Sequence, residues 1–265
     1  MDWTAINHGT LDDFDFPKVL YKYRNWTDEH HDRFIKKREI FLASPSSFED
    51  KKDCKNSFRY DLLSEAQVLE WHENISKREY PNRTKQQRRK DAREWAKQRL
   101  FTDINFLVDY QKKYNYEFAQ RQGVLSLTAE PCLLDMWDKY AAKDKGFCVG
   151  YNSRILFDSL GGGGKVDYCD ELPQILPSPF MTDLEIRNKR IYSKEKRWEF
   201  EKEYRTERFW ENPASISSRQ IQLPKTAFKE IILGNGISKK DREEIFFYVN
   251  KEIGNIPIVE RTNVC

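Results

Sequence analysis

Short runs of β-branched and aromatic residues, interrupted by one long stretch with helical periodicity, limit most strongly how this chain can fold. Such runs are typical of strands, and they occur at 19–23, 40–43, 124–128, 145–151, 165–169, 228–234 and 256–259. Between 57 and 120, apolar residues such as Leu62, Ala66 and Leu69 instead recur at helical spacing. Further helices are expected at 133–142, 183–194 and 238–251. We predict an α+β fold, one domain over 1–265, with a mostly antiparallel central sheet and a mainly helical insertion at about 57–120.

The opening stretch, Lys18 to Phe48, has the pattern of a strand, a helix and a second strand. Its first run ends at Arg24, a helix is expected at about 27–38, and the second run leads into the turn residues Ser44-Pro45. Taken alone, Arg24 is best interpreted as a member of a salt bridge. It becomes a candidate for catalysis if later segments bring partners to it.

The composition indicates a soluble globular protein. Of the 265 residues, 38% are hydrophobic, 34% are charged and 14% are aromatic, which predicts an aromatic-rich core under a charged surface and argues against disorder. The net charge of +3 does not demand a polyanionic partner. Residues 1–17 have the character of a polar, acidic arm without a signal pattern, and no apolar run is long enough to span a membrane. We therefore expect a cytoplasmic protein without a membrane partner.

Cysteine and histidine spacing argues against disulfides and metals. The cysteines are Cys54, Cys132, Cys148, Cys169 and Cys265. This odd, dispersed set without a Cys-x-x-Cys pair predicts free thiols. The four histidines lie in the first third of the chain without metal-ligand spacing, so we expect no metal site.

A strongly basic stretch lies within the expected helical insertion. Residues 77–99 contain ten basic and three acidic side chains, and Arg88, Arg89, Lys90 and Arg93 lie at its centre. Such a helix could follow a phosphate backbone. Alternatively, it is a solvated surface with a local excess of charge.

The segment 198–209 largely alternates and is predicted to be a strand with a carboxylate-rich face. On it, Glu199, Glu201 and Glu203 would lie roughly 7 Å apart, with Arg205 as a neighbouring cation. Carboxylates so placed can stabilise an oxocarbenium-like centre or act as a general base. The alternative is an exposed edge strand whose charges prevent aggregation.

Two other patterns, a pair of hydroxyl residues and a run of glycines, indicate a functional site less specifically than the carboxylates do. Ser126 and Thr128 lie on the polar face of one expected strand, without a nearby His–Asp set for a nucleophilic triad. Their hydroxyls could bind a ligand or orient a carboxylate, or they are simply polar residues on a half-exposed strand. The run Gly161–Gly164 lacks the spacing of a phosphate loop and predicts a flexible connection.

Three blocks of residues stand out along the chain. They are Leu20–Arg24 with Ser44-Pro45-x-x-Phe48; Leu125-Ser126 with Met136–Ala141 and Lys145–Gly150; and Trp198–Arg205 with Lys229–Gly234. With these blocks the chain resembles, over nearly all of residues 18–259, an uncharacterised bacterial domain family that is often found near phage-defence genes. It departs from that family at Glu49–Asp53, where members usually carry Asn-Asp-Pro-Phe-Asp, so the role of this loop is left open.

The order of three short motifs is similar to that of toxin-type ADP-ribosyltransferases. The motifs are Tyr23-Arg24, Ser126-x-Thr128 and Glu201-x-Glu203, and the middle one lacks its usual third hydroxyl because Glu130 stands there. This resemblance implies an ADP-ribosyltransferase-like fold, with NAD as the substrate that donates ADP-ribose.

The same resemblance implies how NAD would be held. Arg24, with Tyr23, would hold its ribose-phosphate part. The hydroxyls of Ser126 and Thr128 would brace the site, and Tyr140 is placed among the residues that bind NAD.

It also implies two catalytic carboxylates beside Arg24. Glu203 would hydrogen-bond the nicotinamide ribose and stabilise the cation that develops there. Glu201 would activate the acceptor.

We therefore expect an ADP-ribosyltransferase-like effector in bacterial anti-phage defence or a toxin system, with a nucleic-acid or protein acceptor and a neutralising partner protein. The alternative is a non-catalytic sensor module, in which the basic helix at Arg88 to Arg93 contacts nucleic acid or a partner and the acidic strand is structural. A nuclease is a third alternative, disfavoured because the sequence has no His/Asp metal cluster.

Overall fold

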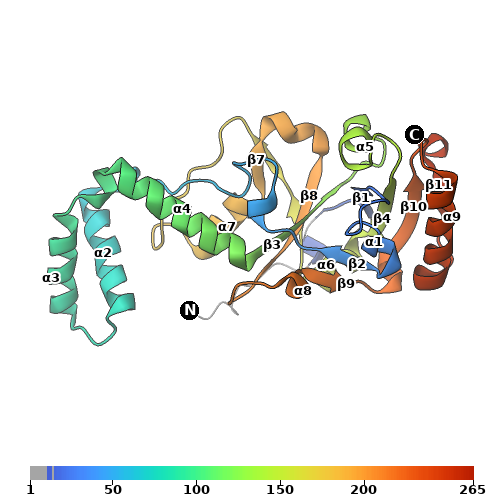
Figure 1. The fold of residues 1–265 in the computed structure, drawn as a ribbon. Coiled ribbons are helices and arrows are strands. Elements are labelled where there is room, and N and C mark those ends of the chain that lie inside the picture. Colours follow the sequence, from blue (N-terminus) through green and yellow to red (C-terminus); the bar gives the residue numbers. More distant parts are fainter. Residues whose placement is uncertain (1–10, 14) are drawn as a thin grey trace.

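A seven-stranded sheet organises the chain (Figure 1). The computed structural model describes residues 11–13 and 15–265, so most of the expected N-terminal arm lies outside the described residues. The strand order is β11-β10-β4-β1-β3-β8-β5. These strands are β1 Val19–Arg24, β3 Gln122–Thr128, β4 Phe147–Asn152, β5 Gly164–Lys165, β8 Glu203–Phe209, β10 Phe228–Leu233 and β11 Ile258–Glu260. Apart from the parallel pair β10–β11, neighbouring strands are antiparallel, which confirms the predicted mostly antiparallel sheet.

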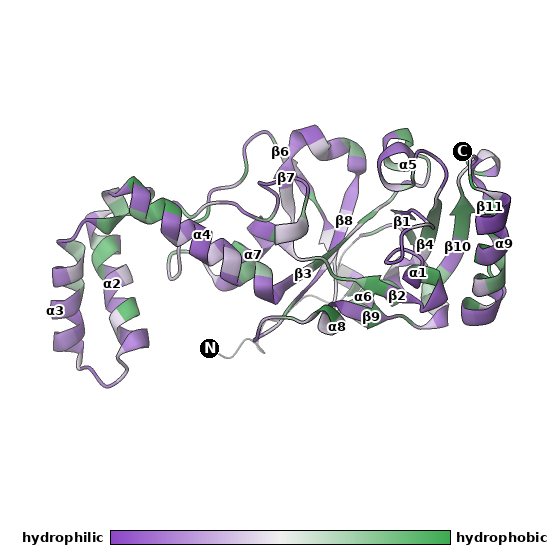
Figure 2. Ribbon diagram, viewed as in Figure 1, coloured by the Kyte–Doolittle hydropathy of each residue, from purple (hydrophilic) through white to green (hydrophobic). Residues whose placement is uncertain are grey.

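The two faces of the sheet are buried against different helices. On one face, alternate residues such as Leu20, Val149 and Ile231 pack in the main core with α6 Ser153–Leu160 and α9 Lys239–Tyr248. On the other face, Tyr23, Cys148 and Ile232 pack against Trp137 of α5 Leu134–Tyr140. The strands β4 and β10 are accordingly the most hydrophobic part of the sheet in Figure 2. Burial on both faces explains the apolar runs Phe147–Val149 of β4 and Ile231–Leu233 of β10, whereas Lys229 at the start of β10 is exposed.

Residues 57–120 are mainly helical, as predicted. The elements are η3 Tyr60–Leu62, α2 Glu65–Glu79, α3 Lys85–Ala96, η4 Leu100–Thr102 and α4 Ile104–Arg121. Capping boxes start α2 at Ser64 and α3 at Thr84, each with a glutamine three residues later. The α2–α3 hairpin forms one end of the molecule, far from the sheet (Figure 1).

The expected helix at about 27–38 is mostly turn, and only α1 Arg33–Lys36 is helical. The side chains of Asn25 and Asp28 accept hydrogen bonds from the backbone N–H groups of Thr27 and His30, which compete with helix formation. The chain then enters β2 Glu39–Phe41, which pairs with β9 Gln220–Gln222, and α8 Ile216–Arg219 precedes that partner.

Two other segments are divided differently from the prediction. The expected strand 165–169 is split between β5 and β6 Asp167–Cys169, and β6 pairs with β7 Ser193–Glu195. Consequently the expected helix 183–194 ends earlier, as α7 Asp183–Ile191. At the glycine run, Gly161 has a φ of 88° and ends α6, a conformation that glycine adopts without strain.

The predicted carboxylate strand at 198–209 is wrong in its first half. Residues Lys196–Glu201 form the 3₁₀ helix η5, Lys202 has a left-handed φ of 43°, and β8 begins at Glu203. Glu199, Glu201 and Glu203 therefore do not share a strand face. The reason is tertiary: both Glu201 and Glu203 bind the ammonium of Lys194, and the turn at Lys202 lets them converge on it.

The prediction of five free thiols is also wrong, because Cys132 and Cys265 form a disulfide. Their Cα atoms lie 5.4 Å apart although 133 positions separate them in sequence. Disulfides persist mainly in oxidising compartments, so this bond does not support the cytoplasmic prediction, which stays a prediction. None of the helices in the described part of the chain is long and apolar enough to span a membrane.

Candidate active site

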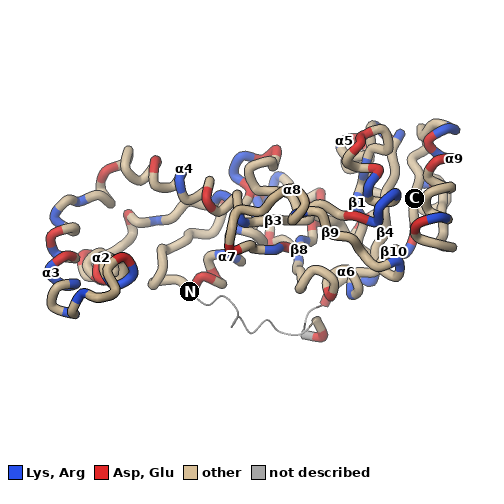
Figure 3. Tube along the Cα trace, turned by 60° about the horizontal axis from the view of Figure 1, so that its bottom comes forward, with Lys and Arg blue, Asp and Glu red and all other residues tan. Residues whose placement is uncertain are grey.

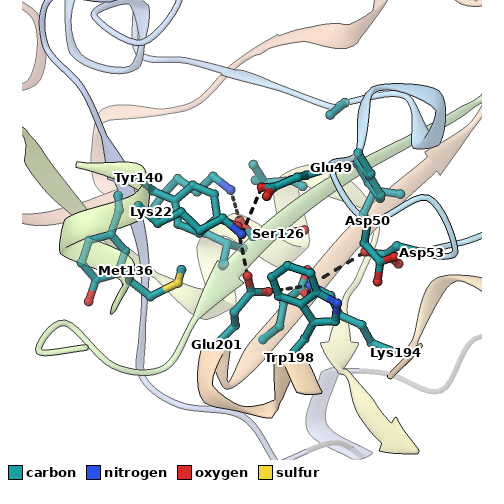
Figure 4. Close-up of a pocket in the computed structure, with 18 of the residues that line it drawn as sticks. Lys22, Glu49, Asp50, Asp53, Ser126, Met136, Tyr140, Lys194, Trp198 and Glu201 are labelled. Carbon is teal, nitrogen blue, oxygen red and sulfur yellow. Dashed lines mark hydrogen bonds and ion pairs between the residues drawn. The ribbon is translucent and has the colours of Figure 1, made fainter. Parts of the chain in front are cut away.

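A cavity of about 340 Å³ opens where two neighbouring strands of the sheet separate (Figure 4). In the described residues, β1 pairs with β3 only at Tyr21 and Thr128. Beyond that pair, residues 22–24 line one wall of the cavity and residues 124–127 line another. The remaining walls come from α5, β7, η5, the start of β8, residues 41 and 43, and residues 47–53.

Six of the residues predicted to form the site line this one cavity. They are Tyr23, Arg24, Ser126, Tyr140, Glu201 and Glu203. Thr128 is the exception: it is fully buried opposite Glu203 in the β3–β8 ladder, and its hydroxyl accepts a hydrogen bond from the Glu130 N–H. Its expected contact with a bound ligand is therefore not supported.

The carboxylate end of the cavity is a buried network of charges. The Lys194 ammonium lies 2.5 Å from Glu201 and 2.9 Å from Glu203. The guanidinium of Arg205 binds Glu203 at 2.7 Å and holds both carboxylate oxygens of Asp53 at 2.7 and 2.8 Å. These five side chains are all less than 10% exposed. Pairing and hydrogen bonding of this kind are what allow charges to remain inside a protein.

The network keeps Glu203 ionised. Burial acts to raise the pKa of Glu203, but the charges of Arg205 and Lys194 outweigh it and lower the pKa to about 2. Burial likewise acts to lower the pKa of Lys194, and the carboxylates of Glu203 and Glu201 raise it above its ordinary value. At neutral pH the cavity therefore presents a fixed carboxylate rather than a group that exchanges protons.

Two aromatic residues complete this end of the cavity. The Tyr140 hydroxyl donates to Glu201 at 3.0 Å, so Tyr140 is held over the second carboxylate. Near it, the Lys139 ammonium lies 4.3 Å from the centre of the Trp198 ring and pairs with Glu49 at 3.0 Å. Helix α5 is thereby tied to both η5 and the 49–53 loop.

Another wall of the cavity carries two basic side chains from β1, Lys22 and Arg24. The Lys22 ammonium donates to the Ser126 carbonyl at 2.5 Å, across the gap between the strands. Arg24 packs over the Phe34 ring, 4.5 Å from its centre, and donates to the Tyr23 carbonyl. Within the part of the chain that the structure describes, Arg24 forms no salt bridge and its buried Nε has no hydrogen-bond partner.

Burial changes the acidity of both cations. Burial, and next the charge of Arg24, lower the pKa of Lys22 well below its ordinary value. Burial also lowers the pKa of Arg24 to about 10, so Arg24 keeps its charge at neutral pH. A half-buried cation without a carboxylate partner is a candidate for binding an anionic ligand.

Several residues of the site were not predicted from the sequence. Lys194 was assigned to the end of a helix, and Lys22 was part of the first block without a role. The 49–53 loop, whose role was left open, supplies Glu49, Asp50 and Asp53 to the cavity walls. No local pattern predicts these contacts, since Asp53 and Arg205 meet across 152 positions.

The predicted nucleic-acid residues lie elsewhere. Arg88, Arg89, Lys90 and Arg93 are on α3 of the α2–α3 hairpin, at the end of the molecule away from the sheet (Figure 1), and none of them lines the cavity. Arg89 lies 3.8 Å from Glu73 of α2. Lys and Arg are interspersed with Asp and Glu along the hairpin (Figure 3). These basic residues therefore form a surface of their own and not a part of the candidate active site.

The described residues contain no group of three or more His, Cys, Asp or Glu side chains that could hold a metal ion. Comparison with known proteins returned no matching family model, curated protein or solved structure. The resemblances noted from the sequence therefore stay proposals. A proposal of function has to rest on the residues that line the cavity.

Proposed function

We propose that the chain is an ADP-ribosyltransferase-like effector of bacterial anti-phage defence or a toxin system, which transfers ADP-ribose from NAD to a macromolecular acceptor. One observation carries this proposal. Arg24, Ser126 and Glu203, which come from separate parts of the chain, line the same cavity. Their strands β1, β3 and β8 are consecutive in the sheet, which supports an ADP-ribosyltransferase-like arrangement of the three motifs.

The cavity has two poles that suit the two ends of this substrate. Arg24 forms the cationic pole, and it is suited to a phosphate of NAD because its guanidinium is charged and has no carboxylate partner among the described residues. The Lys194-bound carboxylates of Glu201 and Glu203 form the anionic pole. NAD would lie across the cavity with its pyrophosphate at the first pole and its nicotinamide ribose at the second.

The reaction at the anionic pole would break one bond and form another. The bond between the ribose C1′ and the nicotinamide nitrogen breaks, and nicotinamide leaves as a neutral molecule with the electron pair. The positive charge passes to C1′ and the ring oxygen, where the ionised carboxylate of Glu203 stabilises it. A hydroxyl or amine of the acceptor then bonds to C1′ and loses its proton to Glu201. The Tyr140 hydroxyl donates a hydrogen bond to this carboxylate.

The test is release of nicotinamide from labelled NAD by the purified protein, with protein and nucleic-acid acceptors supplied separately. The wild-type chain is expected to release nicotinamide, and Glu203→Gln is expected to lose most of this activity, by roughly 100-fold or more. Glu199→Gln is the matched control, because Glu199 is exposed on η5 and does not line the cavity. Equal turnover by the wild type and Glu203→Gln, or none with any acceptor, contradicts the proposal.

A second candidate, a non-catalytic sensor module that binds nucleic acid or a partner protein, is favoured by the exposed basic side chains on α3. Its test is salt-dependent binding of RNA or DNA. Simultaneous charge reversal of Arg88, Arg89 and Lys90 would abolish such binding, while Glu203→Gln would not affect it. The effector proposal, by contrast, includes a single-domain protein that is located in the cytoplasm and is neutralised by a partner protein.

A further inference from the structure

A second cavity, of about 700 Å³, lies where the helical insertion joins the rest of the molecule. Its walls come from α2, α4, α7 and residues 177–179. It shares none of its described lining residues with the candidate active site. Nothing in the proposed transfer reaction uses it.

Aromatic rings form the main apolar part of the cavity wall. The aromatic residues of its wall include Phe58, Tyr60, Trp71, Tyr110, Tyr114 and Phe118. Around the buried ring of Tyr60, the rings of Trp71 and Tyr110 stand at nearly right angles, with centroids at 5.7 and 5.6 Å. Trp71, Tyr110 and Tyr114 are half-buried, so each contributes part of its ring to the cavity surface. The contacts among these rings hold the insertion together, while their accessible parts offer a planar ligand a place to stack.

Basic side chains surround this aromatic wall. Lys77 and Arg78 are exposed on α2, Arg121 comes from the end of α4, and Arg187 comes from α7. Arg121 pairs with Glu117 at 3.7 Å, Arg187 with Glu207 at 3.2 Å and Arg78 with Glu79 at 2.9 Å. Two carboxylates, Glu117 and Asp183, also line the cavity, against four basic side chains. The ligand suggested by this wall has a flat ring and is joined to negative charge.

The aromatic cavity adjoins the basic surface of the hairpin. A groove of about 570 Å³ between α2 and α3 is lined by Lys85, Arg88, Arg89 and Arg93, with Glu70 and Glu73 on the α2 side. Asn74 and Lys77 line both this groove and the aromatic cavity. A chain with regularly spaced phosphates could thus follow the groove and reach the aromatic wall by passing Asn74 and Lys77, which lie about one turn apart on α2.

We propose that the aromatic cavity receives an unstacked base of a single-stranded nucleic acid whose phosphates follow the groove between α2 and α3. Aromatic side chains beside a basic groove are how proteins bind single strands, because every base has a face that can stack and the backbone is uniformly charged. In a duplex the bases are paired and stacked inside the helix, so a duplex cannot fill the cavity without losing a base pair.

The first experiment uses the purified wild-type chain without NAD, so its outcome does not depend on the proposed transferase. Binding of a labelled single-stranded DNA oligonucleotide is measured by fluorescence anisotropy. It is compared with the same strand carrying abasic sites at its centre, with the matched duplex and with the RNA version of the strand. The base-bearing single strand, as DNA or RNA, is expected to bind roughly 5- to 100-fold more tightly than the abasic strand.

The second experiment compares three variants on α4. Tyr110→Leu keeps an apolar side chain but removes the stacking ring, and it is expected to weaken single-strand binding roughly 5- to 100-fold. Tyr110→Phe keeps the ring and should bind like the wild type. Tyr116→Leu is the matched control, because Tyr116 lies on the same helix, is 64% exposed and does not line the cavity.

Two outcomes would overturn the proposal. One is equal binding of base-bearing and abasic strands by the wild type, which would leave only phosphate contacts. The other is equal affinity of Tyr110→Leu and Tyr116→Leu. The comparison of strands with the wild type decides the matter even where a variant does not fold.

Discussion

Asp53 and Arg205 form a two-point ion pair, at 2.7 and 2.8 Å, between the 49–53 loop and strand β8. Both side chains are buried, and Arg205 binds Glu203 through the same guanidinium. The pair therefore joins the wall of the candidate active site to its carboxylate. It gives a structural role to a loop whose role the sequence left open.

Removing the charge of Asp53 should destabilise the protein substantially. Asp53→Asn leaves the buried guanidinium of Arg205 with one carboxylate partner fewer, and breaking a buried pair costs about 3–5 kcal/mol. Urea unfolding followed by circular dichroism measures the loss. Asp61→Asn is the control, because Asp61 pairs with Arg59 at the surface and should matter little. Similar stability of Asp53→Asn and the wild type would refute this role.

The pair network also predicts a pH dependence of stability. The pKa of Glu203 is lowered in the folded protein from 4.5 to about 2. A lowered carboxyl pKa contributes stability that is fully present above about pH 4.5 and is lost as the pH falls toward 2, where the folded state must also bind the proton. This contribution is roughly 3 kcal/mol.

The measurement is the free energy of unfolding of the wild type and of Glu203→Gln across this pH range. The difference between the two proteins should be constant above about pH 4.5 and should shrink as the pH falls toward 2. A difference that does not change with pH would show that Lys194 and Arg205 do not hold Glu203 ionised.

Lys22 should react with amine reagents at neutral pH. Burial and the charge of Arg24 lower its pKa, so more of its amine is neutral and nucleophilic than in a solvated lysine. Limited acylation followed by peptide mass spectrometry should find Lys22 modified ahead of exposed lysines such as Lys229. Excess NAD should protect Lys22 if the proposed substrate occupies the cavity. Labelling of Lys22 no faster than that of Lys229 would count against the lowered pKa.

The disulfide should contribute to stability. Linking Cys132 to Cys265 closes a long loop in the unfolded chain, and loops of this size are worth about 4–5 kcal/mol in the chain-entropy model. The melting temperature of the wild type should fall when a reductant is added. The double variant Cys132→Ser/Cys265→Ser should already have the lower value and should not respond to the reductant. Identical melting of the oxidised and reduced wild type would contradict the prediction.

Periodicity in the sequence was sufficient to place most strands and the helical insertion. The runs at 19–23, 124–128 and 228–234 became central strands because their β-branched and aromatic residues fit a sheet that is buried on both faces. The failures occurred where side-chain contacts outweigh local pattern. Alternation in 198–209 predicted one strand, but the shared contact with Lys194 bends the chain at Lys202.

For the candidate site, the sequence alone determined the residue types, and the tertiary structure decided which of them meet. The motif order singled out Arg24, Ser126 and Glu203, which line one cavity. Lys194 and Asp53 could not have been predicted, because their roles depend on contacts between distant segments. The cavity exists because β1 and β3 separate after the pair Tyr21–Thr128. The sequence of a strand indicates that it will join a sheet, but it does not indicate at which residue the neighbouring strand stops pairing with it.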